Sequence, residues 1–465
     1  MERRYAVRKK ALLAECAVRP EVFADWERRL GEFVEPFAEL LNQEKQQDHA
    51  MTYLLGLLSN VQRKNVESIA YEYDQDRKNL QHFVGQADWN DAPLRGELAR
   101  QIGHELGEAD GVLVFDPSSF PKKGRESVGV DRQWSGRLGK VDNCQVGIYL
   151  AYVGRSEHAL VDMRLYLSEE WAKDKKRRKK AGVPKEVRFA TRHSLALQML
   201  DEHGLALPHR WITGDDEMGR SSGFRRDLRG REEQYLLMVP SNTTVRDLDS
   251  PAPDYHGSGR HPKQPFQRVD RWAAALPESA WTKLDVRDGT KGPLVVEVAC
   301  CRVLARTERS KPADEETLLV FRAKQDDETW KRDYALSNAS AQTPLAEFAR
   351  VFKAEHRIEE CFQRGKSEAG LGDYQVRNWR GWHHHQTLSL IAAWFITRET
   401  LRGKKIHSRV NRPASPQWFG TAAGRTFLPM HFRHRQPQHR ATTPTQHPGG
   451  VLSLEATQPL AALTP

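Results

Sequence analysis

Three acidic residues stand in contexts from which a fold could bring them to one point. Asp116 follows the apolar run 111–115 (GVLVF), Asp215 follows the run ITG, and Glu359 lies in HRIEECFQRGKSEAGL, whose apolar spacing is helical. Carboxylate oxygens are the ligands that hard divalent cations prefer. In phosphoryl transfer, two Mg²⁺ ions about 3.5–4 Å apart activate the attacking oxygen and stabilise the leaving oxygen. The three acids therefore favour a two-metal phosphoryl-transfer site that uses Mg²⁺, with Mn²⁺ as a substitute.

Two of these positions have an acidic neighbour that must be weighed against them. An Asp after a strand often caps a turn or helix instead of binding metal, and strand geometry does not choose between Asp215 and Asp216. In the helix, a spacing of about 100° per residue puts Glu359 and Lys366 on one side of the apolar face and turns Glu360 away. That face consists of Ile358, Cys361, Phe362, Gly365 and Ala369. The wheel therefore favours Glu359 as the third acid.

The order of the elements between residues 108 and 240 is that of an α/β sheet. Apolar runs with strand spacing alternate with helical segments. Strands are expected at 111–115, 144–153, 159–167, 210–213 and 235–240, and helices at 188–204 and 223–229. Three adjacent strands, a helix, a strand, a helix and a strand are the order of an RNase H-like sheet. Open α/β sheets carry their chemistry at the carboxyl ends of the strands, which is where Asp116 and Asp215 stand.

We therefore expect an α/β protein in which an RNase H-like mixed sheet with flanking helices is accompanied by a β-rich insertion and an N-terminal all-helical domain. The helical domain would serve DNA binding or dimerisation, or would be purely structural, and a basic tail without periodicity is expected to be disordered. The boundaries are 1–105 for the helical domain, 106–244 for the first part of the catalytic domain, 245–335 for the insertion, 336–402 for the second part with the Glu-bearing helix, and 403–465 for the tail. Single helices are expected over 344–369 and 385–401.

Positive charge is concentrated in two segments. The chain has 72 Lys and Arg against 62 Asp and Glu, a net charge of +10. Residues 171–188 carry nine basic and two acidic residues, and residues 401–465 carry nine and one, so the rest of the chain is slightly acidic. Such segments favour a polyanion as partner. We expect the first segment to be a loop, either merely solvated or in contact with DNA through Lys175, Lys176, Arg177 and Arg178.

Other features of the composition narrow the class of protein. No apolar run approaches the roughly 18 residues of a membrane span, and five cysteines without a CxxC pair indicate neither a zinc module nor a disulfide framework. We expect a cytoplasmic, reduced protein without membrane contact. The run His383-His384-His385 does not predict a metal site, because consecutive side chains point to different sides of a helix.

Three blocks of the chain, by their order and spacing, resemble the DDE transposases of bacterial insertion sequences. The blocks are DPSSFPKKG at Asp116, ITGDDEMG at Asp215 and RIEECFQRGKSEAGLGDYQVRNWRGWHHH at Glu359. The resemblance is greatest to the branch of DDE superfamily endonucleases and covers roughly residues 30–400. It implies an RNase H-like catalytic domain with a β insertion before the last acid. In that domain Asp116, Asp215 and Glu359 would be the catalytic, metal-binding residues.

The same resemblance implies which cations contact DNA. Lys366 matches the phosphate-contacting lysine of the family's helix signature, and Lys122 and Lys123 belong to the PKKG segment after the first acid. Lys122, Lys123 and Lys366 are therefore expected to bind DNA.

At the second acid the chain departs from the family at one position. After Asp215 the family usually has an aromatic residue at the position that Met218 occupies here.

The chain departs from the helix signature at two positions. Phe352 and Glu355 stand where the family has Tyr and Arg, so Arg357 or His356 is expected to supply the missing phosphate contact. Two further cations alternate with aromatic residues, which suits a DNA-facing surface: Arg377 and Arg380.

The resemblance implies a transposase that nicks DNA at transposon ends with metal-activated water and joins the freed 3′-OH to target DNA. Its partner would be double-stranded DNA, both transposon ends and target, bound by a homodimer or higher oligomer at the bacterial nucleoid. In relatives an aromatic residue of the insertion stacks on a flipped base; Trp272, Trp281 and Trp330 are candidates, with ordinary packing as the alternative. Two alternative functions are an RNase H-like DNA nuclease without strand transfer and a non-catalytic DNA-binding derivative, which the three acids disfavour.

Overall fold

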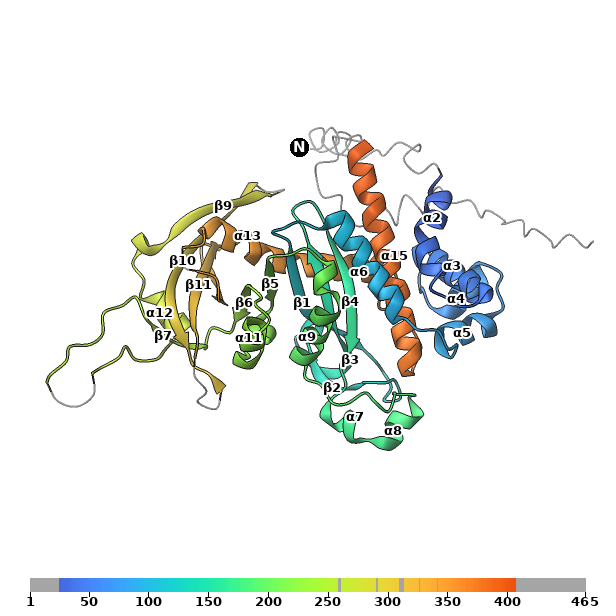
Figure 1. The fold of residues 1–465 in the computed structure, drawn as a ribbon, viewed down its shortest axis with the longest axis horizontal. Coiled ribbons are helices and arrows are strands. Elements are labelled where there is room, and N and C mark those ends of the chain that lie inside the picture. Colours follow the sequence, from blue (N-terminus) through green and yellow to red (C-terminus); the bar gives the residue numbers. More distant parts are fainter. Residues whose placement is uncertain are drawn as a thin grey trace, which may run out of the picture. The chain divides into compact units, whose positions relative to one another are not determined.

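A computed structural model describes residues 25–257, 261–289, 292–308, 313–325, 327–340 and 342–406 (Figure 1). The basic tail beyond residue 406 lies outside these residues, and so does the disorder predicted for it. Within the described part of the chain, no helix is both long enough and apolar enough to cross a membrane.

Five strands form the central part of the sheet: β1 (Val112–Pro121), β3 (Lys140–Val153), β4 (His158–Leu165), β5 (Trp211–Gly214) and β6 (Tyr235–Val239). β3 pairs antiparallel with β1 and β4, whereas β5 runs parallel to β1 and β6. The resulting order β4–β3–β1–β5–β6 is RNase H-like, so the predicted fold class is confirmed. Parallel strands are buried on both faces, which explains why β1 begins with the continuous, fully buried apolar run 112–115.

The first strand is longer than the sequence predicts. Its pairing with β5 ends where Phe115 lies opposite Gly214, but its pairing with β3 continues to Pro121, opposite Cys144. Asp116 therefore lies within β1, at the point where the parallel ladder ends. The prediction that the strand stops at residue 115 is wrong because β3 supplies a backbone partner for the polar residues that follow.

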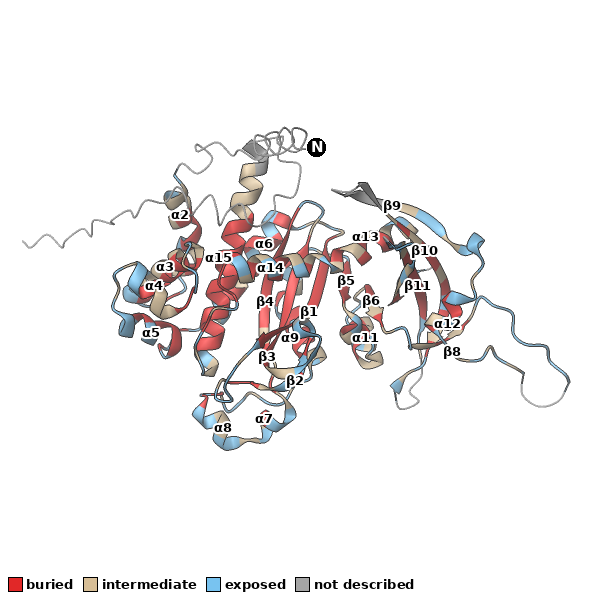
Figure 2. Cartoon of the chain, turned by 180° about the vertical axis from the view of Figure 1, so that it is seen from behind, coloured by how far each residue is buried: buried red, intermediate tan, exposed pale blue. Residues whose placement is uncertain are grey.

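Helices cover the sheet, and one of them connects it to the N-terminal part of the chain. The helices before the sheet are α2 (Trp26–Ala38), α3 (Glu44–Leu58), α4 (Val66–Glu72), α5 (Arg77–Gly85) and α6 (Ala92–Leu106). The long helix α15 (Trp379–Ile406) packs against α3, α5, α6 and β4 and is buried over most of its length (Figure 2). The prediction of helices before the sheet holds for the described residues.

The β-rich insertion continues the same sheet. Its elements are β7 (Thr244–Asp247), β8 (Gln267–Arg268), α12 (Val269–Ala274), β9 (Thr282–Gly289), β10 (Gly292–Ala305), β11 (Glu315–Lys324) and β12 (Trp330–Ser337). β12 pairs antiparallel with β6, from Tyr334 opposite Val239 to Ser337 opposite Leu236. Hydrogen bonds between these two strands therefore join the insertion to the central strands, and its own buried cluster around Trp272 gives it a second core.

The helix expected over 344–369 is two helices, α13 (Leu345–Glu355) and α14 (Arg357–Glu368), which meet at His356. α13 packs on β5 and β1, whereas α14 packs on β4, β1 and β3. Because neighbouring strands of a sheet are rotated by about 20–25° relative to one another, one straight helix could not follow both sets of strands. Neither Pro nor Gly marks the break, so the sequence does not predict it.

Candidate active site

Two of the predicted acids stand side by side on neighbouring strands. Because Phe115 lies opposite Gly214 at the end of the parallel ladder, Asp116 and Asp215 are the next residues on β1 and β5. Strands in a sheet are about 4.8 Å apart, and these two carboxylates leave their strands at the same level. Both residues are half-buried.

The structure also distinguishes Asp215 from Asp216. Asp215 caps α10 (Asp216–Gly219), since its Oδ1 accepts hydrogen bonds from the backbone nitrogens of Glu217 and Met218, each at 3.1 Å. Asp216 is exposed and pairs with Arg220 at 3.1 Å. The helix-cap reading of Asp215 is therefore correct, but the cap uses Oδ1 and orients the carboxylate beside Asp116.

The acids at this end of the sheet destabilise one another's ionised forms. Burial, followed by the nearby carboxylates of Asp215, Glu355 and Glu359, raises the pKa of Asp116 well above its ordinary value. Burial and neighbouring carboxylates, partly offset by the hydrogen bond from Met218, raise the pKa of Asp215 to about 7. A cluster of half-buried carboxylates without arginine partners is typical of functional sites, because a cation or a proton must relieve the repulsion.

The third predicted acid approaches from α14. Glu359 is exposed in the first turn of the helix, and its carboxylate contributes to the raised pKa of Asp116. The helix is anchored over the same part of the sheet: the Phe362 ring lies edge-on to Tyr149, with centroids 5.0 Å apart, and Tyr149 is the ladder partner of Asp116. Lys366 donates from Nζ to the Ser118 hydroxyl at 2.9 Å, two residues beyond Asp116 on β1.

Glu360 points elsewhere, but it is less exposed than Glu359, which a position opposite the apolar face does not predict. Its carboxylate pairs with Arg357 at 2.7 Å and lies 3.5 Å from the ring of His158 on β4. Arg357, a predicted phosphate contact, is therefore bound to Glu360 in this structure.

Glu355 is an acid of this cluster that sequence reasoning did not assign to it. It is the last residue of α13, its side chain is only 13% exposed, and it is hydrogen-bonded to His356. Its charge contributes to the raised pKa values of both Asp116 and Asp215. The one signal in the sequence was an acid four residues before Glu359, at the helix signature's Arg position.

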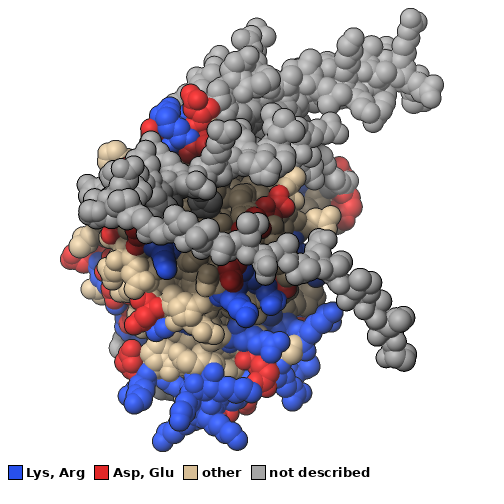
Figure 3. All heavy atoms as spheres, turned by 90° about the vertical axis from the view of Figure 1, so that its right-hand side faces the viewer, with Lys and Arg blue, Asp and Glu red and all other residues tan. Residues whose placement is uncertain are grey.

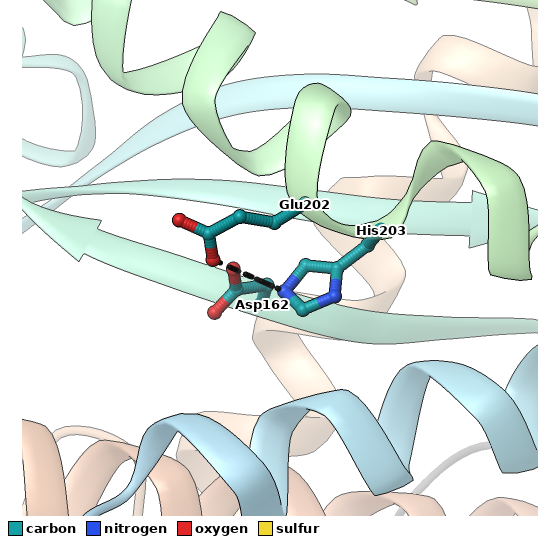
Figure 4. Close-up of side chains that lie close together, drawn as sticks. All are labelled: Asp162, Glu202 and His203. Atoms are coloured by element: carbon teal, nitrogen blue, oxygen red, sulfur yellow. Dashed lines mark hydrogen bonds and ion pairs between the residues drawn. The ribbon is translucent and has the colours of Figure 1, made fainter.

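A different group of side chains meets the distance criterion for a metal site. In the described part of the chain, one set of three residues has ligand atoms within 4.8 Å of one another: Asp162, Glu202 and His203 (Figure 4). Asp116, Asp215 and Glu359 do not form such a set, so their carboxylates stand further apart than they would around one shared cation.

The Asp162 group is an ion-pair network. Asp162 on β4 is fully buried and accepts hydrogen bonds from Arg95 of α6 at 2.7 Å, Arg164 at 2.6 Å and the His203 ring of α9 (Arg192–His203) at 2.9 Å. Burial alone would raise the pKa of this carboxyl, but Arg95 and Arg164 hold it well below its ordinary value. Both carboxylate oxygens are thus committed to arginines, and these hydrogen bonds join α6, β4 and α9.

The cationic segment after β4 is helical, so the prediction of a loop is wrong. It forms α7 (Glu169–Lys173) and α8 (Lys175–Lys180), and the caps Ser168 and Asp174 each accept a hydrogen bond from a backbone nitrogen of the helix that follows. Figure 3 shows Lys and Arg gathered at the lower end of the molecule, where Figure 1 places these two helices. Caps at both helix starts compensate for the repulsion within the basic run.

The basic residues of α8 divide into two kinds. Arg178 donates to the backbone oxygens of Ala172, Pro184 and Val187, and Arg177 donates to those of Arg125 and Val130 while it stacks over Trp171. Lys180 pairs with Glu126. The exposed side chains that form no ion pair within the described residues are Lys175, Lys176 and Lys179.

Four more predicted DNA contacts have distinct surroundings. Lys122 lies with Nζ 3.6 Å from the centre of the Tyr374 ring, and burial lowers its pKa to about 8. Arg380 donates to the Gln86 carbonyl and pairs with Asp88 at 2.8 Å. The other two, Lys123 and Arg377, are exposed.

The histidines singled out in the sequence and Trp272 are buried, whereas Trp281 and Trp330 are half-buried. His383, His384 and His385 are buried in α15, and each ring is hydrogen-bonded to a backbone oxygen. Trp272 donates to Asp247 at 2.8 Å. The Arg322 guanidinium lies over the rings of both Trp281 and Trp330, at 4.1 and 4.3 Å from their centres. Ordinary packing therefore accounts for each of these side chains.

The strand order and the pair of half-buried acids at the ends of β1 and β5 define an RNase H-like protein with an acidic candidate site. The sequence profile described as DDE superfamily endonuclease matches residues 36–293, more than half of the chain. The chain belongs to this family. The matched region contains Asp116 and Asp215 and ends before Glu359.

Two individual proteins are similar to parts of the chain. The "Probable transposase for insertion sequence element IS701" of Microchaete diplosiphon is 33% identical over 101 residues, which are 21% of this chain and 27% of that protein. The chain thus matches about a quarter of that relative's length. A cryo-EM structure of piggyBac transposase in a synaptic complex with hairpin DNA is 12% identical, with a TM-score of 0.39, over 82% of this chain and 70% of that one.

The Asp162 network makes a testable prediction about stability. Asp162→Asn removes a buried charge that two arginines require, so we expect the free energy of unfolding to fall by about 3–5 kcal/mol, measured by urea denaturation. Glu202→Gln, at a side chain that is 50% exposed, should cost less than about 1 kcal/mol. A melting temperature that rises with added Zn²⁺ in the wild type but not in Glu202→Gln would contradict the assignment and make the group a metal site.

Proposed function

We propose that this chain is a transposase that cleaves DNA at transposon ends and transfers the freed 3′-OH into target DNA. The observation that carries the proposal is the placement of Asp116 and Asp215 side by side, with Glu359 reaching the same cluster from α14, in a member of the DDE superfamily endonucleases. The similarity to a probable transposase supports transposition as the purpose of the cleavage.

The donor set fits divalent cations. Asp116, Asp215 and Glu359 offer carboxylate oxygens, which Mg²⁺ and Mn²⁺ prefer, and the raised pKa values of the two aspartates mark a site where added positive charge is stabilising. When bound, such ions supply the charge that activates the attacking oxygen and stabilises the leaving one. In this proposal Asp116, Asp215 and Glu359 hold Mg²⁺, and Lys366, kept beside β1 by Ser118, positions the scissile phosphate.

Within this proposal, the exposed basic residues form the DNA-binding surface. Lys175, Lys176 and Lys179 of α8 and the exposed Lys123 and Arg377 would contact phosphates, and Lys122 would contribute where its ammonium remains charged. Arg177 and Arg178 would maintain the shape of α8. Double-stranded DNA would be bound by a homodimer or higher oligomer, so that two ends are processed together.

A nuclease that cuts without joining is the second candidate, because the family's description specifies endonuclease activity alone. Incubation of the full chain with a labelled duplex that ends in a 3′-OH, a plasmid target and Mg²⁺ separates the two functions. Covalent joining of the label to the plasmid supports the transposase, whereas cleavage without joining supports the nuclease. Retention of DNA binding with neither reaction would indicate a non-catalytic derivative.

Glu359 and Glu360 provide a matched pair of variants for the catalytic assignment. Loss of a metal ligand removes several kcal/mol of transition-state stabilisation, so Glu359→Gln should lower the cleavage rate about 100-fold or more while DNA affinity stays within about twofold. Glu360→Gln, which loses only its pairing with Arg357, should stay within about threefold of the wild type. Equal losses in both variants would remove Glu359 from the site.

The exposed lysines of α8 provide a test of DNA contact. If Lys175, Lys176 and Lys179 each neutralise one phosphate, their joint replacement by Ala should reduce the slope of log affinity against log salt by about 2.7. The control replaces Lys283, Lys324 and Lys331, which are exposed on the insertion. Fluorescence anisotropy of a labelled duplex at several salt concentrations gives both slopes. An unchanged slope in the α8 variant would show that this helix is a solvated surface that does not contact DNA.

A further inference from the structure

The hairpin between β2 (Asp131–Ser135) and β3 exposes a group of large apolar side chains. Trp134 is 55% exposed, Val141 49% and Leu138, in the short helix η2 (Gly136–Leu138) at the turn, 40%. Trp134 and Val141 are direct partners in the β2–β3 ladder, so their side chains lie on the same face. Apolar side chains gathered in this way on a soluble surface indicate an interaction site.

The hairpin lies on the face of the sheet that carries Asp116. Tyr149 is the ladder partner of Asp116, and Val141 lies eight residues before Tyr149 on β3. Because side chains alternate between faces, an even separation puts both on the same face, and eight residues span roughly 26 Å. No register shift interrupts the β1–β3 or β2–β3 ladders between these points. That distance corresponds to roughly eight base pairs of a DNA duplex.

Cations follow the same face from the acids to the hairpin. Lys366 reaches Ser118 on β1, Lys122 lies over the Tyr374 ring, and the exposed Arg132 shares its face with Trp134, two residues away on β2. The base of the hairpin is joined to the basic helices, because Trp171 of α7 and Arg177 of α8 both donate to the Val130 carbonyl. Alternating cations and an exposed aromatic ring suit a nucleic acid.

We propose that the face of the β2–β3 hairpin formed by Arg132, Trp134, Leu138 and Val141 binds the DNA duplex that leads away from the catalytic acids. This inference rests on the proposed function. Trp134 and Leu138 contact sugars or bases, and Arg132 contacts a phosphate. A second copy of the chain is the less favoured occupant, because two surfaces bordered by α8 would repel each other. Duplex DNA complements the same charge.

Trp134→Ala in the full chain tests this surface. We expect the affinity for a labelled 30-base-pair duplex, measured by anisotropy, to fall about tenfold or more, because a Trp at the centre of an interface is typically among the residues that contribute most to binding. The salt slope should not change, because no charge is removed. The control Leu205→Ala removes another exposed apolar side chain, in η3 (Gly204–Ala206) before β5, and should bind as the wild type does.

Wild-type affinity in Trp134→Ala would overturn the inference and leave the proposed function standing. A change of oligomeric state in sedimentation, with unchanged DNA affinity, would overturn it in favour of a second copy. Failure of the wild type to bind duplex DNA would instead contradict the proposed function itself.

A separate observation concerns Glu355. At the start of β5 the Trp211 indole donates to Glu347 of α13 at 2.7 Å. From there Glu355 is eight residues along the helix, about 12 Å, and Asp215 is four residues along the strand, about 13 Å. α13 packs on both β5 and β1 and thus brings Glu355 to the level of the two aspartates.

We infer that Glu355 is a fourth carboxylate of the catalytic cluster and a ligand for a divalent cation beside Asp116 and Asp215. This inference also rests on the proposed function. Glu355 is mostly buried at the end of α13 and has His356 as its partner, so it adds a carboxylate beside the two aspartates whose charge a bound cation would offset. Glu359, which is more exposed, then completes the site from the solvent side.

Calorimetric titration of the full chain with Mn²⁺ tests this role without relying on cleavage. Glu355→Gln should lower Mn²⁺ affinity at least tenfold, and Glu360→Gln should not change it. Charge reversal in Glu355→Arg should raise the melting temperature in EDTA, because it relieves repulsion, and should lower Mn²⁺ affinity at least as much as Glu355→Gln does. Unchanged Mn²⁺ affinity in Glu355→Gln or in Glu355→Arg would overturn the inference, while Glu359→Gln still reports on the proposed function.

Discussion

Repulsion between carboxylates at the ends of β1 and β5 is the constraint on which the rest of the structure depends. The parallel ladder fixes Asp116 and Asp215 at one level, and α13 and α14 add Glu355 and Glu359. Left alone, such groups would separate or take up protons, which is the meaning of the raised pKa values. The surrounding scaffold must therefore hold the strands and helices in place without neutralising the acids, and the packing of α13 and α14 on β1 provides that hold.

Another buried acid of the same sheet, Asp162, has the opposite environment. Asp162 on β4 is fully buried, yet two arginines and a histidine satisfy it, and its pKa falls far below the ordinary value. The arginine-paired acid is structural and joins α6, β4 and α9, whereas the unpaired acids at β1 and β5 are available to a cation. Proximity of ligand atoms alone would have selected the Asp162 group. The presence or absence of arginine partners is therefore the better criterion here.

Local patterns in the sequence were sufficient for the central strands and for the place of Asp116 at the end of the parallel ladder, because the apolar run before it depends on neighbours in the chain. The helical wheel separates Glu359 from Glu360, but it does not show that Glu360 lies against His158 of β4 while Glu359 is exposed. The continuation of β1 to Pro121, the break at His356 and the position of Glu355 depend on β3, on sheet twist and on the direction of α13. These are contacts between residues far apart in sequence, which spacing alone does not contain.

In the basic segment 171–188, contacts of this kind decide which of the cations counted in the sequence are available to a partner. Counted in the sequence, residues 171–188 carry nine cations and invite a uniform reading as a DNA-binding loop. In the fold, Arg177 and Arg178 are tied to backbone oxygens and Lys180 to Glu126, so part of the charge builds α8 instead of meeting a partner. Arginine suits contacts within the protein because its planar guanidinium can donate hydrogen bonds to several carbonyls at once. Lysine suits the exposed positions because its flexible ammonium remains hydrated until it contacts a phosphate. The choice between the two cations within α8 therefore separates the residues that shape this surface from those that can bind DNA on it.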